Sequence, residues 1–187
     1  MLKRKVFFVL FPFILKFVEN GLLPESSYGR YFDAIIDRFE VVYENKSIWE
    51  WNIKVRKINK TRSLVGYVLV KEPLGNDFKD KTVLLKKQGG EYRYQPYGIP
   101  PTPLCLLLVD DKYTYPDIAK NSDFPADVVH NCPFKPANYS FNGVTFSLKN
   151  VPKIIVPSGD YAVELTFYDS ITKFAGIYRI YGTIIQV

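Results

Sequence analysis

Apolar and polar residues alternate along several segments of this chain of 187 residues. The clearest case is WEWNIKVRKIN, residues 49–59, in which Trp49, Trp51, Ile53 and Val55 are separated by polar side chains. Successive side chains of a strand point to opposite faces, so this period of two predicts a strand with one buried face and one solvated face.

The segment PSGDYAVELTFYD, residues 157–169, repeats this alternation with Tyr161, Val163, Leu165 and Phe167 on one face. Its Pro and Gly mark a turn before the strand. Other strand-like runs cover residues 38–43, 63–70, 82–87, 92–97, 139–141, 144–148 and 176–187. Many short strands separated by turn signals predict an all-β protein, either an antiparallel immunoglobulin-like β-sandwich or an open barrel.

Two features modify this all-β pattern. Asn142-Gly143 has the residue preference of a tight hairpin turn, so we expect the runs on either side of it to pair. The segment PLCLLLVDDKYTYPDIAKN, residues 103–121, clusters leucines and then polar residues, which favours one or two short helices interrupted around Pro116.

The N-terminus has the layout of a secretory signal. Three basic residues, Lys3, Arg4 and Lys5, precede an apolar run that ends at Val18 and is broken by Lys16. The run is shorter than the ~20 residues of a spanning helix, which leaves a membrane anchor as the less favoured alternative. We expect a signal peptide over residues 1–18, with cleavage between about 18 and 28, one domain over 29–187, and an extracellular protein without stable membrane insertion.

Removal of this segment changes the charge of the protein. The whole chain has 25 basic and 19 acidic residues, a net charge of +6. The predicted signal peptide contains four of the basic residues and no carboxylate, so the mature chain is close to neutral. Its remaining Lys and Arg are scattered, whereas nucleic-acid binding needs a dense basic patch, and we expect no nucleic-acid partner.

Three sequons and two cysteines also fit secretion. The sequons predict glycosylation at Asn45, Asn59 and Asn138. In an oxidising compartment an even pair of cysteines favours a disulfide between Cys105 and Cys132. The alternative is a free catalytic thiol at Cys132 activated by His130, the one histidine of the chain.

The sequence contains few other features that would support an enzymatic function. One histidine cannot build a multi-histidine metal site, and the chain contains neither a nucleophile elbow nor a phosphate-binding glycine loop. Asp110 with Asp111, or Glu164 with Asp169, could in principle perform acid/base hydrolysis. Paired acids are common on surfaces, so we predict a protein that is not an enzyme and uses no cofactor or metal.

The C-terminal half is similar to a known family over roughly residues 100–168. The similarity consists of the Leu/Cys segment, the HNCPF motif at 130–134, VPKIIVPSGDY at 151–161 and the aromatic strand after it. In this order they resemble the insect CheB-type chemosensory proteins and their relatives, a group that is compared with the ML lipid-recognition domains, which include the ganglioside-activator protein. Many relatives have further cysteines nearer the mature N-terminus, and this chain has none.

The resemblance implies a β-cup, in which two antiparallel sheets enclose an apolar cavity that receives a lipid or long-chain hydrocarbon. It also implies a role in chemosensation, such as contact-pheromone perception, with a chemosensory receptor or channel as a further partner. The alternating aromatic and aliphatic positions are the candidate cavity lining: Trp49, Trp51, Ile53, Phe141, Phe146, Tyr161, Val163, Leu165 and Phe167.

Large rings can fill a core as well as line a cavity. Two functions therefore remain open: a carrier or presenter of apolar ligands, and a secreted protein-interaction module with a filled core. A connected internal void of several hundred Å³ would favour the carrier.

Overall fold

The computed structural model of the chain describes residues 32–112, 114–146, 157–169 and 173–186. The predicted signal peptide and its cleavage region lie outside the described residues. The same holds for residues 147 and 148 of the run 144–148 and for the first half of VPKIIVPSGDY, so the expectations for these residues stay predictions.

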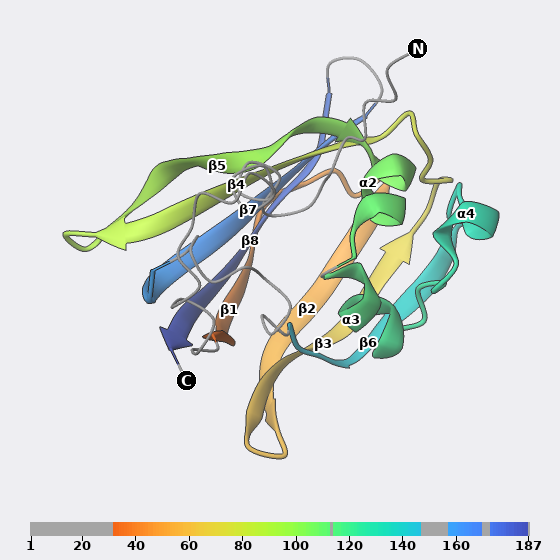
Figure 1. The fold of residues 1–187 in the computed structure, drawn as a ribbon. Helices are drawn as coiled ribbons and strands as arrows, with labels where there is room; N and C mark the ends of the chain where they lie inside the picture. Colours follow the sequence, from red (N-terminus) through yellow and green to blue (C-terminus); the bar gives the residue numbers. More distant parts are fainter. Residues whose placement is uncertain (1–31, 113, 147–156, 170–172, 187) are drawn as a thin grey trace, which may run out of the picture.

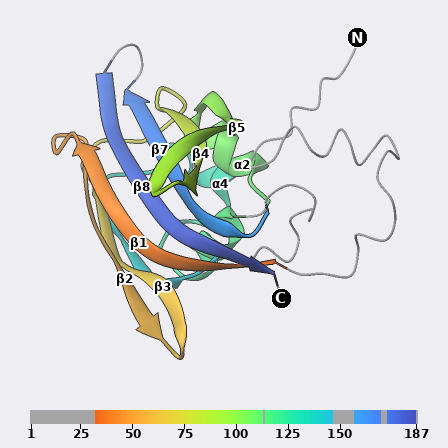
Figure 2. The same ribbon diagram turned by 90° about the vertical axis from the view of Figure 1, so that its left-hand side faces the viewer.

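Two antiparallel sheets face each other (Figures 1 and 2). The larger sheet has the order β1-β8-β7-β4-β5 and the smaller one the order β2-β3-β6. The larger sheet consists of β1 (Phe32–Glu44), β8 (Lys173–Gln186), β7 (Gly159–Asp169), β4 (Lys79–Gln88) and β5 (Glu91–Pro103). The smaller sheet consists of β2 (Trp49–Ile58), β3 (Thr61–Val70) and β6 (Ala137–Val144). The predicted all-β antiparallel sandwich is confirmed.

Three short helices follow β5 and precede β6: α2 (Leu104–Asp110), α3 (Tyr115–Lys120) and α4 (Val128–Asn131). Helix α2 contacts β4, β5 and α4, while α3 contacts β6. On the opposite side of the sandwich, β1 contacts β2 and β3 directly. One side of the sandwich is therefore closed by strands and the other by helices (Figure 1).

The prediction of one or two short helices within residues 103–121 corresponds to two, α2 and α3. Pro116 lies in the first turn of α3, where its missing N–H costs no hydrogen bond. It thus helps the second helix to begin. Helix α4 was not predicted, because it is only one turn long; the Asp127 side chain caps it by accepting a hydrogen bond from the His130 N–H.

The predicted hairpin turn at Asn142-Gly143 is wrong. Strand β6 continues through both residues, and its pairing with β3 shifts between Val65, opposite Asn142, and Leu64, opposite Val144. Gly143, with φ of +98°, is the extra residue of a β-bulge. The positive φ that makes Asn-Gly suitable for a hairpin turn serves a bulge equally well.

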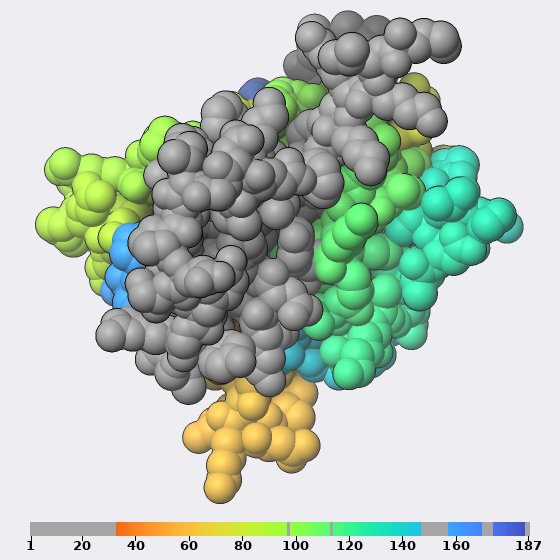
Figure 3. Space-filling model, viewed as in Figure 1, coloured from red at the N-terminus to blue at the C-terminus, as the bar shows by residue number. Residues whose placement is uncertain are grey.

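A tight hairpin turn does occur between β2 and β3. Ile58 pairs with Thr61, and the two residues between them, Asn59 and Lys60, have φ of +46° and +72°. Two consecutive positive φ values are typical of the turn type whose twist matches paired strands. This hairpin projects from the body of the molecule, in gold in Figure 3.

Aromatic rings join the two sheets on the strand-closed side. Trp49 and Trp51 of β2 pack against Tyr178 of β8, with ring centroids 6.0 and 4.5 Å from the tyrosine ring. Phe167 of β7 lies 4.8 Å from Trp49, and Phe39 of β1 lies 6.0 Å from Trp51. We refer to these five residues as the aromatic cluster.

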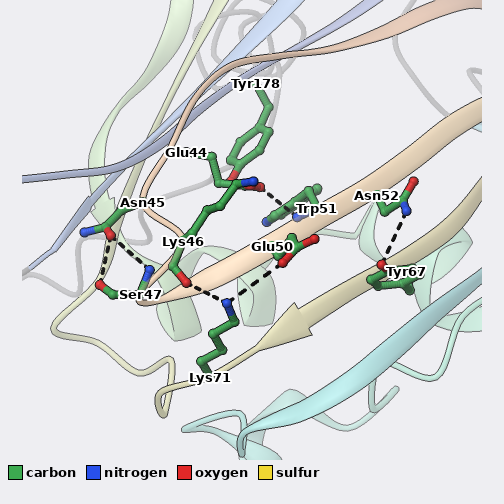
Figure 4. Close-up of polar contacts among 10 residues, drawn as sticks. All are labelled: Glu44, Asn45, Lys46, Ser47, Glu50, Trp51, Asn52, Tyr67, Lys71 and Tyr178. Atoms are coloured by element: carbon green, nitrogen blue, oxygen red, sulfur yellow. Dashed lines mark hydrogen bonds and ion pairs between the residues drawn. The ribbon is translucent and has the colours of Figure 1, made fainter.

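A carboxylate fastens this cluster (Figure 4). The Oε1 atom of Glu44, at the end of β1, accepts hydrogen bonds from the Trp51 backbone N–H at 2.7 Å and from the Tyr178 hydroxyl at 3.3 Å. Burial, and then the adjacent carboxylate, raise the pKa of the Tyr178 phenol, which stays a donor. One side chain thus links β1, β2 and β8.

Candidate functional site

The space between the sheets contains a cavity of about 290 Å³. Its walls come from both sheets and from the helices, and they are almost entirely apolar. The larger sheet contributes Ile36, Leu84, Ile99, Tyr161, Val163, Leu165, Phe167, Ile180 and Ile184; the smaller sheet contributes Trp49, Trp51, Val68 and Phe141.

Strand alternation explains why these side chains reach the cavity. Along β7, Tyr161, Val163, Leu165 and Phe167 all line it, which is the face that the sequence pattern selects. Of the nine proposed lining residues, the structure places eight at the cavity wall: Trp49, Trp51, Phe141, Phe146, Tyr161, Val163, Leu165 and Phe167.

Ile53 is the exception and corrects the proposed lining. It is buried, 8% exposed, and belongs to the hydrophobic core, but it does not line the cavity. Ile53 pairs with Gly66 of β3, farther along β2 than the tryptophans. The alternation therefore selects the correct face of β2, but it cannot tell how far along the strand the cavity extends.

The helices complete the wall on the side where the sheets do not meet. Leu104, Leu107 and Leu108 of α2 and Ile118 of α3 line the cavity. Phe124 and Phe134, which flank α4, also contribute, and their rings are 5.7 Å apart. The leucine cluster predicts a helix. The segment is too short for its periodicity to indicate that this helix borders a cavity.

Asp80 is a carboxyl group in this apolar wall. It lies on β4 opposite Phe167 of β7, lines the cavity and is 2% exposed. Its Oδ2 atom accepts a hydrogen bond of 2.7 Å from the Thr82 hydroxyl, but its buried Oδ1 atom has no partner in the described part of the chain. Burial raises the pKa of Asp80 to about 7, and the hydrogen bond from Thr82 acts in the opposite direction.

Sequence reasoning missed Asp80, because Lys79 and Lys81 give its surroundings the look of a solvated charged run. A signal was nevertheless present. Asp80 is two and four residues before Thr82 and Leu84, so the alternation of the strand places all three on one face. Both Thr82 and Leu84 line the cavity.

A second buried polar atom at the cavity has no partner among the described residues. It is the indole Nε1 of Trp51. The neighbouring Trp49 differs, because its Nε1–H donates a hydrogen bond of 3.0 Å to the carbonyl oxygen of Ala175.

The other polar side chains at the cavity wall use their polar atoms within the protein. The Asp111 carboxylate accepts hydrogen bonds from the backbone N–H groups of Thr114 and Tyr115, at 2.7 and 3.0 Å, and so stabilises the start of α3. The Tyr115 hydroxyl donates to the carbonyl oxygen of Pro125 at 2.6 Å, and that of Tyr161 donates to Pro157 at 2.7 Å.

The predicted disulfide between Cys105 and Cys132 is confirmed, with 6.0 Å between the Cα atoms. It connects α2 to the residue that follows α4. Cys132 is therefore not a free thiol. His130 is exposed, and its Nδ1 lies 2.6 Å from Asp127 Oδ2; this hydrogen bond lowers the pKa of the Asp127 carboxyl.

The structure also locates the paired acids considered for hydrolysis. Asp110 ends α2, and the adjacent Asp111 caps α3. Glu164 lies on the outer face of the larger sheet, where its Oε2 accepts a hydrogen bond of 2.7 Å from Arg179 Nε. Asp169 is the last residue of β7. Glu164 is thus engaged by a cation away from the cavity.

The three sequon asparagines lie on loops or strand edges. Asn45 is in the β1–β2 turn, where its Oδ1 accepts hydrogen bonds from the backbone N–H and the hydroxyl of Ser47 (Figure 4). Asn59 is at the tip of the β2–β3 hairpin. Asn138 is exposed on β6, an edge strand of the smaller sheet. Glycosylation at these sites stays a prediction.

Two other kinds of feature are absent from the residues that the structure describes. In residues 32–112, 114–146, 157–169 and 173–186, no group of three or more His, Cys, Asp or Glu side chains is arranged to hold a metal ion. Within the same residues, no helix has the length and apolar character needed to cross a membrane.

The fold and the site together define an all-β antiparallel sandwich with an apolar internal cavity and one disulfide between its helices. Residues 81–163 match the sequence model of a family described as "Protein of unknown function (DUF1091)". The matched segment runs from β4 into β7 and includes the helices and both cysteines. No curated protein matches the chain.

Proposed function

We propose that the protein is a secreted carrier or presenter of apolar ligands, such as a lipid or long-chain hydrocarbon. The observation that carries this proposal is the cavity of about 290 Å³ with an apolar wall built from both sheets and the helices. Its volume is at the lower end of the range of about 300–1,000 Å³ that is typical of small-molecule sites.

The physical basis of such binding is the removal of apolar surface from water. Each CH₂ group that leaves water contributes about 0.8 kcal/mol, with little dependence on direction. Affinity then depends on the length of chain that fits, and selectivity depends on the shape of the wall. No catalytic group is needed for this function.

The resemblance to CheB-type and ML proteins supports the same proposal and adds a setting. The setting that the resemblance implies is insect chemosensation, such as contact-pheromone perception, with a chemosensory receptor or channel as the recipient of the ligand. The matching family description names no function, so this setting rests on the resemblance alone.

The two tryptophans of the chain provide a direct test, because both line the cavity. Protein secreted with its disulfide formed is titrated with decane or with N-phenyl-1-naphthylamine. We expect a change in tryptophan fluorescence that saturates with ligand, and displacement of the naphthylamine by decane. Solvent extraction followed by mass spectrometry should also recover a co-purified lipid or hydrocarbon.

A pair of variants shows whether the ligand occupies the cavity. Val163→Trp adds a large ring to a wall residue of β7 and should weaken naphthylamine binding at least tenfold. Leu69→Trp makes a comparable change on β3 at a position between the inward-facing residues Val68 and Val70, and should leave binding unchanged. Equal binding by both variants, or an unresponsive wild type, would contradict the proposal.

The alternative, a protein-interaction module with a filled core, receives less support from this geometry. A filled core has no space of this size, whereas the cavity here has walls from three layers of structure. Specific capture of a protein partner by a ligand-free form that binds no apolar probe would favour the alternative.

A further inference from the structure

The cavity wall contains a carboxyl oxygen, Oδ1 of Asp80, that no described residue satisfies. Most buried polar atoms in proteins have a hydrogen-bond partner, and an unpartnered one costs free energy. Asp80 is 2% exposed, yet its Oδ1 has no partner in the described part of the chain. The other acid of the wall, Asp111, is occupied by the start of α3.

Among the described residues, no cation forms an ion pair with Asp80. Lys79 and Lys81, its neighbours on β4, alternate to the other face of the sheet, and neither forms a described ion pair with it. On the flanking strands it faces Phe167 of β7 and Thr102 of β5. The Thr102 hydroxyl donates instead to the carbonyl oxygen of Pro100, at 2.8 Å.

A donor group lies on the opposite wall. Trp51 Nε1 is likewise buried, with no partner among the described residues, and the Trp51 ring is 6.2 Å from the ring of Phe167. Phe167 is also the residue that pairs with Asp80 across β7 and β4. Asp80 and Trp51 are therefore both neighbours of Phe167 at the wall of the same cavity.

We propose that the ligand of this cavity is an aliphatic chain that carries a hydroxyl group, and that this hydroxyl forms a hydrogen bond with Asp80. The inference rests on the proposed function and specifies its ligand class. The chain occupies the apolar space, and the hydroxyl supplies the partner that Oδ1 lacks.

A hydroxyl suits this position better than other polar groups. With a pKa near 7, Asp80 is present in both protonation states at neutral pH. A hydroxyl donates to the ionised carboxylate and accepts from the protonated acid, because it is both donor and acceptor. An ammonium group interacts best with the ionised form, an ester carbonyl accepts only from the protonated form, and a ligand carboxylate repels Asp80 when both are ionised.

The test compares decan-1-ol with decane, which share the chain and differ in the hydroxyl. Naphthylamine displacement measures both ligands on the wild type, on Asp80→Leu and on the control Thr102→Val, which removes a buried hydroxyl beside Asp80. In Asp80→Leu we expect the affinity ratio of decanol to decane to fall at least about tenfold, the factor typical of a hydrogen bond to a charged group. Thr102→Val should keep the wild-type ratio.

The outcomes separate the two proposals. Binding of decane with an unchanged ratio in Asp80→Leu overturns the hydroxyl assignment and leaves the carrier function standing. Tighter binding of decylamine than of decanol by the wild type also overturns it. If neither decane nor naphthylamine binds, the carrier function fails, and the hydroxyl assignment fails with it.

A measurement on the wild type covers the case in which Asp80→Leu does not fold. The ¹³C chemical shift of the Asp80 carboxyl carbon is followed against pH without ligand, with decane and with decanol. Contact with a hydroxyl should shift this titration relative to the decane-bound protein. Identical titrations with the two ligands would overturn the assignment.

Discussion

Around Trp49 the interior is filled with rings, whereas around Asp80 it is left open. In the aromatic cluster, Trp49 is 1% exposed and Tyr178 is fully buried, and the polar atoms of both rings have protein partners. At the cavity wall, Asp80 Oδ1 has none in the described residues. Trp51 belongs to both regions, because it packs in the cluster and lines the cavity, and its Nε1 also has no partner among the described residues. The comparison shows that the unsatisfied polar atoms of the described interior occur at the cavity wall.

Trp49→Ala tests the packed region and should have the largest effect. The change removes contacts with four rings and the indole hydrogen bond to the Ala175 carbonyl, which also accepts from the Asn45 N–H. We expect a loss of about 3–5 kcal/mol in unfolding free energy, the range for truncation of a buried aromatic residue. Urea denaturation followed by circular dichroism measures it. A loss below 1 kcal/mol would mean that the cluster is not tightly packed.

Asp80→Asn tests the open region through the pH dependence of the unfolding free energy. The pKa of Asp80 is raised to about 7 in the folded protein, above its ordinary value of 3.8, so the folded state holds this proton more tightly. The stabilisation of the folded protein by this tighter proton binding is fully present below about pH 4, and it is lost as the pH rises through about 7.

The change in unfolding free energy of the wild type between pH 4 and 8 should therefore exceed that of Asp80→Asn by as much as about 4 kcal/mol. Urea denaturation of both proteins at several pH values gives this difference. Parallel curves would show that the carboxyl is solvated in the folded protein, and the contrast between the two regions would be lost.

Cys105→Ser tests the disulfide that cross-links the helical segment at the border of the cavity. The disulfide closes a loop between residues 27 apart in sequence. Loss of such a cross-link should lower the unfolding free energy by about 3 kcal/mol in the chain-entropy model. Thermal denaturation of the variant measures it, with the reduced wild type as the comparison. An unchanged melting temperature in both would contradict the prediction.

Glu44→Ala should have the smallest effect of the four changes. It removes the acceptor for the Trp51 N–H and the Tyr178 hydroxyl (Figure 4), and we expect a loss of about 1–3 kcal/mol. Glu50→Ala is the control, because its ion pair with Lys71, at 3.9 Å, is at the surface and should contribute less than about 1 kcal/mol. Equal losses in the two variants would show that Glu44 does not fasten the cluster.

The sequence predicts the parts of this molecule that repeat a simple period. Alternation identified the inward faces of β2 and β7, and the even number of cysteines identified the disulfide. The Asn142-Gly143 prediction failed because a tight turn and a β-bulge require the same backbone conformation. Helix α4 was missed because a single turn capped by Asp127 has no period to detect.

The cavity itself was harder to predict than the strands around it. Trp49, Ile53 and Phe167 have similar sequence signatures, yet Ile53 lies in the core while the other two reach the cavity. Asp80 looks solvated because its sequence neighbours are lysines; alternation puts it on the face of Thr82 and Leu84, and the pairing of β4 with β7 shows that this face borders the cavity. Whether a side chain fills space or borders it depends on residues distant in sequence.

The disulfide has a consequence for how the protein could admit ligands of different sizes. Cys105 lies in the first turn of α2, which follows the edge strand β5 of one sheet, and Cys132 precedes the edge strand β6 of the other, so the bond is a covalent cross-link across the flank where no strands meet. Moving the two sheets apart on that flank would strain this cross-link. A bulkier ligand would therefore have to be accommodated by rotamer changes of the lining side chains. The oxidised protein should then discriminate among ligands more sharply than the reduced one.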